Sequence, residues 1–241
     1  MNTTPMTIGI LVNVAAVVIG GLLGSVLGHK LPERIKTLLN MTFGVCAMTM
    51  GITSIILIRN MPAVFLAVIL GATIGAGLKL NERVRTGVTK LVARIFPART
   101  EQGTDNSLLI TAMVLFCASG TGIYGSLVSG MEGDHSILLA KAVLDLFTAA
   151  IFACELKQTT ALIAIPQLII MLLLFFSARL ILPLTNEVMI ADFKACGGIL
   201  LVATALTILK VKPFPLVDLI PAMILVMPIS YLWTTYIVPL L

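Results

Sequence analysis

The sequence predicts an all-α, polytopic helical membrane protein with about eight transmembrane helices. Composition carries the first part of this prediction. The chain of 241 residues is 59% hydrophobic and only 11% charged, whereas soluble domains carry roughly 25% charged residues. Its mean hydropathy is +1.09. Successive runs of about 18 or more almost uncharged residues carry the second part, because each is long enough to cross a bilayer as a helix.

Eight runs qualify as spans, and polar or basic segments separate them. They cover about residues 6–28, 40–58, 62–80, 107–130, 136–156, 160–183, 193–210 and 214–233. We expect one membrane domain over 1–241, made of a front repeat region (1–96), a polar linker (97–106) and a back half (107–241).

The charges between the spans predict the topology. Lys and Arg in short loops mark the cytoplasmic side, and they dominate the loops after the first and third spans. The loop at 131–135 carries Glu132 and Asp134 and is therefore placed outside, which puts both termini outside as well. The net charge of +5 resides mostly in such loops, so we expect the lipid bilayer as its partner and no nucleic acid. The basic residues are Lys30, Arg34 and Lys36 after the first span, and Lys79, Arg83, Arg85, Lys90, Arg94 and Arg99 after the third.

Two of these basic segments repeat one another. Gly28–Thr37 and Gly77–Thr86 are identical at six of ten positions, which indicates a direct repeat of a two-helix unit. A weaker likeness relates spans two and three to spans seven and eight, in opposite orientation. Internal repeats are frequent in transporters. Both basic segments are amphipathic, so we expect each to form an interfacial helix. Either could serve as an anchor or as a lipid-sensing element.

The first span carries a ridge of small residues. Gly20, Gly24 and Gly28 recur every four residues and so lie on one helix face. Such ridges let two helix backbones approach closely. We expect helix packing here, either within one chain or across a homo-oligomer.

The fifth span contains a charge pair inside an apolar run. Lys141 and Asp145 lie four residues apart and therefore share a helix face. A charge at the centre of a membrane helix costs about 2.5–3.5 kcal/mol on insertion scales. Asp145 lies roughly 15 Å into its span at the α-helical rise, close to the midplane. Two interpretations stay open: an ion pair that fixes helix rotation, or a carboxylate that binds a cation or proton in competition with Lys141.

The fourth span mixes glycines with hydroxyl groups over 119–126. Ser119, Thr121 and Ser126 are candidate oxygen ligands for a cation. Glycine costs about 1 kcal/mol in a helix interior relative to alanine, so this segment can unwind or kink and expose carbonyl groups to a cavity. The alternative is that the hydroxyl groups bond to their own helix. Asn13 and Gln167 are lesser candidates, expected to join helices by hydrogen bonds.

The motifs of intramembrane enzymes do not occur in this sequence. It has no HExxH and no serine–histidine constellation, and the predicted topology puts His29 and His135 on opposite sides of the membrane. The four cysteines have neither metal-site nor disulfide spacing. We therefore expect no enzymatic activity, no metal site and no organic cofactor.

The segment from Gly133 to Asp145, after a glycine-rich span, resembles the signature of a family of uncharacterised bacterial membrane proteins that includes YqgA and YdfK. The opening Ile8-Gly-Ile-Leu-Val-Asn13 fits the same family. The resemblance covers nearly the whole chain and implies a bacterial inner-membrane location, but no substrate. The chain departs from the family pattern in two places: at Ser119–Gly122, where alanine and methionine are more usual, and at Lys157, where a glycine is usual.

The leading hypothesis from the residues is a transporter or channel for a small cation or proton. Asp145 would be its binding carboxylate and Lys141 its partner. Ser119, Thr121 and Ser126 would supply further oxygens. The alternative is a non-transporting scaffold or regulatory protein that acts through protein or lipid partners. A transporter needs a polar route to Asp145, whereas a scaffold needs only a dry core.

Overall fold

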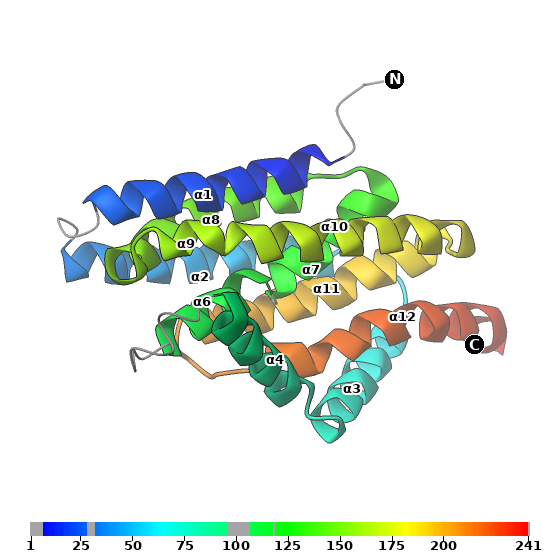
Figure 1. Ribbon diagram of the computed structural model, residues 1–241. Helices are drawn as coiled ribbons and strands as arrows, with labels where there is room; N and C mark the ends of the chain where they lie inside the picture. The colour runs from blue at the N-terminus through cyan, green and yellow to red at the C-terminus, as the bar shows by residue number, and fades with distance from the viewer. Residues whose placement is uncertain (1–6, 28–31, 96–106, 118, 241) are drawn as a thin grey trace. The chain divides into compact units, whose positions relative to one another are not determined.

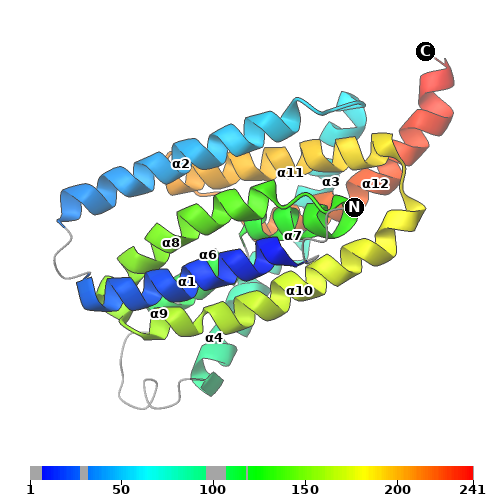
Figure 2. The same cartoon turned by 90° about the horizontal axis from the view of Figure 1, so that it is seen from above.

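Helices make up nearly all of the computed structural model, which describes residues 7–27, 32–95, 107–117 and 119–240. Seven helical segments of this described part are long and apolar enough to cross a membrane, and a bent helix pair brings the number to eight. The predicted all-α, polytopic architecture is confirmed. The helices, drawn in Figures 1 and 2, are α1 (Ile8–Leu27), α2 (Glu33–Ile55), α3 (Met61–Gly77), α4 (Leu80–Ile95), α6 (Ser107–Cys117), α7 (Gly120–Glu132), α8 (Ser136–Leu156), α9 (Thr159–Leu162), α10 (Ala164–Ile181), α11 (Glu187–Ile208) and α12 (Ile220–Leu232).

The fifth predicted span is confirmed to the residue, because α8 covers Ser136–Leu156. The second span begins earlier than predicted. The basic segment after α1 does not form an interfacial helix of its own, since α2 runs without a break from Glu33 to Ile55. That expectation was wrong because a single helix satisfies the backbone of both segments without a turn between them. Lys30 and Leu31 lie outside the described residues.

The third span is followed by a separate basic helix, as predicted. α3 ends at Gly77, and α4 continues at an angle of 53° to it. The apolar face of α4 packs through Val92, which is 1% exposed, while Arg83, Arg85 and Lys90 are exposed. α4 therefore has the two-faced character that the sequence indicates.

The described chain divides into two compact units. Unit 1 comprises Met1–Asn40 and Glu82–Arg179, and unit 2 comprises Met41–Asn81 and Leu180–Leu241. Each unit combines segments from the front and the back of the chain. The predicted linker at 97–106 lies outside the described residues.

In unit 1, α1 and α8 lie side by side in both Figures 1 and 2. Two of the ridge glycines make this contact possible. A Cβ atom at Gly20 would collide with the carbonyl oxygen of Leu146, and one at Gly24 with the carbonyl oxygen of Ala150. Residue numbers increase together along the two helices, so α1 and α8 run parallel. Gly28 lies outside the described residues.

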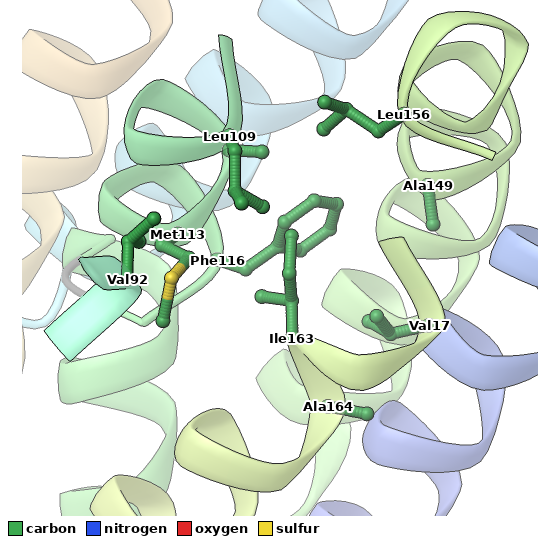
Figure 3. Packing of buried hydrophobic residues seen from close by; sticks show 10 residues of the cluster. Val17, Val92, Leu109, Met113, Phe116, Ala149, Leu156, Ile163 and Ala164 are labelled. Carbon is green, nitrogen blue, oxygen red and sulfur yellow. The ribbon is translucent and has the colours of Figure 1, made fainter. Parts of the chain in front are cut away.

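Apolar side chains fill the rest of unit 1 around α6. Figure 3 shows Phe116 of α6 among Leu109, Ile163 and Val17. The ring of Phe116 also meets that of Phe152 edge to face, with centroids 6.1 Å apart. This apolar cluster lies toward the Lys157 end of α8, because Leu156 belongs to it.

Gly24→Ala is expected to lower the free energy of unfolding by about 1–3 kcal/mol, because overpacking forces α1 away from α8. The measurement is unfolding in mixed micelles titrated with SDS. Gly87→Ala in α4 is the control, since nothing lies within 4 Å of a Cβ atom there. That variant should gain up to about 1 kcal/mol from helix propensity. Equal effects of the two substitutions would contradict the close packing of α1 on α8.

In unit 2, glycines again set the helix contacts. α3 packs on the segment that begins α12, because a Cβ atom at Gly71 would collide with the backbone of Ala222 and one at Gly75 with that of Asp218. α2 crosses α11 at Gly51, where a Cβ atom would lie 2.8 Å from the carbonyl oxygen of Gly198. The backbones of four helices thus approach closely within this unit.

Three lysines follow helix ends in the left-handed backbone region. Lys79, Lys157 and Lys210 have φ values of 51°, 53° and 57° and follow α3, α8 and α11. A non-glycine residue there costs roughly 1–2 kcal/mol. A cation at a helix C-terminus recovers part of this cost through the helix dipole. Gly133, which follows α7, also has a positive φ, of 71°, and as a glycine it adopts this value without that cost.

Candidate functional site

The buried charge pair of unit 1 belongs to a four-residue polar cluster. Lys141 Nζ lies 2.9 Å from Asp145 Oδ1 and 2.8 Å from Oδ2. Asn13 of α1 donates its Nδ2 hydrogen to Asp145 Oδ2 at 2.9 Å. Gln167 of α10 donates through Nε2 to Asp145 Oδ2 at 3.2 Å and to Asn13 Oδ1 at 2.8 Å. The cluster therefore joins three helices of unit 1 at one carboxylate.

All four side chains are removed from solvent. Asn13 and Gln167 are 0% exposed, Lys141 is 3% exposed and Asp145 is 7% exposed. A lysine and an aspartate in such surroundings are tolerated only as a pair, because an isolated buried charge is far more costly. The two amides add hydrogen bonds to the charged carboxylate, and such bonds are stronger than those between neutral groups.

The position of Lys141 depends on a glycine of α7. A Cβ atom at Gly122 would lie 3.2 Å from Lys141 Cε, so the missing side chain makes room for the lysine stem. One turn further along α7, a Cβ atom at Gly125 would meet the side chain of Leu138 at 2.8 Å. These two contacts show that α7 and α8 run antiparallel.

The same register places the interruption of the fourth span beside the charge pair. Gly125 faces Leu138, and Gly122 faces Lys141. Because the helices are antiparallel, Ser119, three residues before Gly122, lies level with Leu144, three residues after Lys141. Leu144 is next to Asp145. At this level α6 has ended at Cys117 and α7 begins at Gly120. A helix N-terminus carries a partial positive charge, and α7 starts near the carboxylate.

The three predicted hydroxyl ligands are arranged differently from one another. Ser119 caps α7, accepting the backbone N–H of Gly122 at 3.2 Å. Thr121 Oγ1 lies 3.4 Å from Ser119 Oγ. Neither shows a hydrogen bond to Asp145 within the described residues. Ser126 is 0% exposed, and its Oγ has no hydrogen-bond partner in the described part of the chain. Ser119 and Thr121 therefore bond locally, and only Ser126 keeps a free oxygen.

Gln167 provides a second free oxygen, inside the cluster itself. Its Nε2 makes two hydrogen bonds, while its Oε1 has no partner among the described residues. The sequence predicts only that Asn13 and Gln167 join helices. They do so, but they also contact the carboxylate. The sequence separation of 132 residues between Asn13 and Asp145 hides this contact from any local pattern.

Unit 2 contains a second buried carboxylate, at a position that the sequence does not mark as a candidate site. Asp192 of α11 is 0% exposed. Its Oδ1 accepts the backbone N–H groups of Arg59 and Asn60 at 2.8 and 2.9 Å. Its Oδ2 accepts Asn60 Nδ2 at 3.0 Å and Ser230 Oγ at 2.6 Å. The available signal is Asn60 before Met-Pro, which is typical of a helix start. The predicted seventh span begins at 193 and so excludes Asp192.

The two carboxylates differ in chemistry. Asp145 has a cationic partner and a nearby free acceptor, so its contacts can be exchanged. Asp192 accepts four hydrogen bonds from uncharged groups, which saturates its two oxygens. No group of three His, Cys, Asp or Glu side chains in the described ranges could hold a metal ion. The cluster around Asp145 is thus the candidate functional site, and the bonds of Asp192 hold the start of α3 against α11 and α12.

Comparisons with known proteins place the chain in a family without assigning an activity. A family model described as a protein of unknown function, DUF554, matches residues 8–231. The uncharacterised protein YqgA of Escherichia coli strain K12 is 46% identical over 234 residues, which are 96% of this chain and 99% of that protein. The uncharacterised membrane protein YdfK of Bacillus subtilis strain 168 is 24% identical over 221 residues, covering 90% and 93% of the two chains. No solved structure matches. The resemblance seen in the sequence is confirmed, and the chain belongs to the DUF554 family of proteins of unknown function.

Proposed function

We propose that this protein moves a small cation or a proton across a bacterial inner membrane, with Asp145 as the carboxylate that takes it up. One observation carries the proposal. A buried carboxylate and its lysine lie beside an interrupted helix, together with an amide oxygen that has no partner in the described chain. Discontinuous helices near the midplane are a frequent feature of transporter binding sites.

In this proposal, Lys141 competes with the transported cation or proton for the Asp145 carboxylate. While Asp145 is empty, Lys141 neutralises it at 2.8 Å. An arriving cation or proton neutralises the carboxylate instead, and the ammonium group is then released from it. The stem of Lys141 packs on the backbone of α7 at Gly122, where a Cβ atom would lie 3.2 Å from Lys141 Cε. Occupied and empty forms would then differ in the position of one buried charge.

Sequence patterns support the same proposal. The repeated basic segments and the weaker inverted likeness fit the internal repeats of transporters. Basic residues at the ends of α3, α8 and α11 support a cytoplasmic placement of those ends. Both termini then lie outside.

Asp145→Asn is expected to abolish flux in proteoliposomes, because the amide keeps the shape of the carboxylate but cannot carry its charge. Flux of Na⁺, K⁺ and H⁺ is followed separately with ion-sensitive dyes. Asp218→Asn is the matched control, since Asp218 accepts a backbone N–H from Asn81 in unit 2 and has no place in the cluster. Both variants are first checked for folding by size-exclusion profile.

A non-transporting scaffold is the second candidate, and one observation favours it. The oxygens of Asp145 already receive hydrogen bonds from Lys141, Asn13 and Gln167, as in a purely structural cluster. A scaffold predicts no flux of the three ions in the wild type and a loss of stability in Asp145→Asn. Flux in the wild type that disappears in a folded Asp145→Asn protein excludes this candidate.

A further inference from the structure

Three buried side-chain oxygen atoms of the described chain, two from hydroxyl groups and one from an amide, have no hydrogen-bond partner. All three lie in unit 1. They are Ser126 Oγ, Thr160 Oγ1 and Gln167 Oε1. Each of these residues is 0% exposed. Buried polar groups in proteins are almost always bonded to protein or to ordered water, so these three oxygens require partners.

The two hydroxyl groups also depart from the habit of this chain. Hydroxyl groups within a helix usually bond to a carbonyl oxygen of the preceding turn. In unit 1, Thr148 does so with Leu144 at 2.8 Å, and Ser177 does so with Leu173 at 2.7 Å. Ser126 and Thr160 do not bond in this way. Their oxygens are therefore available for water, which typically makes about three hydrogen bonds at such sites.

Ser126 and Thr160 lie on opposite sides of Asp145 along α8, and Gln167 lies at its level. Thr160 and Gln167 are seven residues apart on the almost continuous α9–α10 segment, hence on one face and roughly 10 Å apart. Ser126 lies on α7 one turn beyond Gly122, which contacts Lys141. α7 runs antiparallel to α8, so Ser126 lies toward the His135 end of α8. Lys141 therefore lies between Ser126 and Asp145. The free oxygens thus mark two half-routes for a proton. The first contains Ser126 and leads from the His135 end of α8 to Lys141. The second contains Gln167 and Thr160 and leads from Asp145 toward the Lys157 end.

This arrangement suits a proton better than a metal cation. A hard cation needs about six oxygen ligands around one point, whereas the three free oxygens here belong to three different helices, α7, α9 and α10. Asp145 Oδ2 is moreover occupied by hydrogen-bond donors from Asn13 and Gln167. A proton needs only a carboxylate and a chain of hydrogen-bonded water. Lys141 is the charged side chain in contact with Asp145.

Resting on the proposed function, we propose that the species carried past Asp145 is the proton, relayed by water bound at Ser126, Gln167 and Thr160. A hydronium ion on one side gives its proton to the Asp145 carboxylate, and Lys141 separates from the now neutral acid. The acid then gives the proton to water on the other side, and Lys141 pairs with the carboxylate again. One proton crosses in each cycle, and no other reactant is consumed.

The test is proton flux in proteoliposomes for Thr160→Val and Ser126→Ala. The controls are Thr148→Val and Ser177→Ala, which remove hydroxyl groups that already have a partner. We expect each half-route variant to slow proton flux by at least about tenfold, and each control to keep wild-type flux. All four substitutions are nearly isosteric, and folding is checked by SDS unfolding. Na⁺ and K⁺ flux are recorded in the same vesicles.

The outcomes separate the two levels of the proposal. Na⁺ or K⁺ flux without proton flux overturns the proton assignment and leaves the proposed function standing. Proton flux that is unchanged in both Thr160→Val and Ser126→Ala overturns the route. Absence of flux for all three ions overturns the proposed function and the inference with it. The inference is supported if proton flux is slowed in both Thr160→Val and Ser126→Ala and stays at the wild-type rate in both controls.

Discussion

Lys141→Met is expected to lower the free energy of unfolding by about 3–5 kcal/mol, because it leaves a buried carboxylate charged and unpaired. Lys141 is 3% exposed, and its Nζ lies 2.8 Å from Asp145 Oδ2. The two amides of the cluster cannot replace a positive charge. Unfolding in mixed micelles titrated with SDS measures the loss.

The double variant Lys141→Met/Asp145→Leu is expected to recover most of that stability. Replacing a buried ion pair by apolar side chains of similar volume is often neutral or stabilising. The control is Lys36→Met, which breaks an ion pair with Glu33 at 2.7 Å in which Glu33 is 84% exposed. Exposed pairs contribute about 0–1 kcal/mol. A Lys141→Met protein as stable as Lys36→Met would contradict the expected cost of removing the partner of Asp145.

The same double variant separates a structural role from a functional one. If the pair only fixes the rotation of α8, an apolar replacement leaves a stable and fully competent protein. If Asp145 takes up the transported species, the double variant is stable and inactive. Stability and flux must therefore be measured on the same preparation.

The charge pair could be predicted because its spacing is local. Two charges at i and i+4 in an apolar run identify one face of one helix, and α8 forms over the predicted residues. Its amide partners could not be assigned in the same way. Asn13 and Gln167 reach Asp145 only through the packing of α1 and α10, which no local period encodes.

The interruption of the fourth span could be predicted only in outline. The glycine–hydroxyl cluster indicates that the helix can unwind. The break lies at the start of that cluster because Ser119 caps α7 through its side chain. The sequence suggests Ser119 as a free ligand, whereas its oxygen is used by the helix end. A cap signature was available, since serine leads among helix N-cap residues.

The role of Asp192 could not be predicted because it is entirely tertiary. Asp192 lies near the start of a long apolar helix, where an acidic residue is ordinary. Its four donors come from the α2–α3 connection and from α12. Only the folded unit brings these groups to one carboxylate.

Asp192→Ala is therefore expected to destabilise unit 2 by about 4 kcal/mol, because each donor left unsatisfied costs roughly 1–3 kcal/mol and water can replace only part of the loss. Asp192→Asn should lower the stability less than Asp192→Ala, because the amide keeps one acceptor oxygen. It should still be destabilising, because its NH₂ group faces donors instead of accepting their hydrogen bonds. Ser230→Ala removes a single donor and should cost about 1 kcal/mol. SDS unfolding measures all three variants. The loss of stability should be largest for Asp192→Ala, smaller for Asp192→Asn and smallest for Ser230→Ala.

Hydrogen exchange locates the effect. The amide protons of Arg59 and Asn60 bond to Asp192, so both should lose protection in Asp192→Ala. Asp218→Asn is the control, because Asp218 accepts the N–H of Asn81 and lies at the other end of α3. It should leave Arg59 and Asn60 protected. If Asp192→Asn were as stable and as protected as the wild type, the carboxylate would not be the acceptor of four hydrogen bonds. α3 would then be held only through its second half, by the packing of Gly71 and Gly75 on the α12 segment.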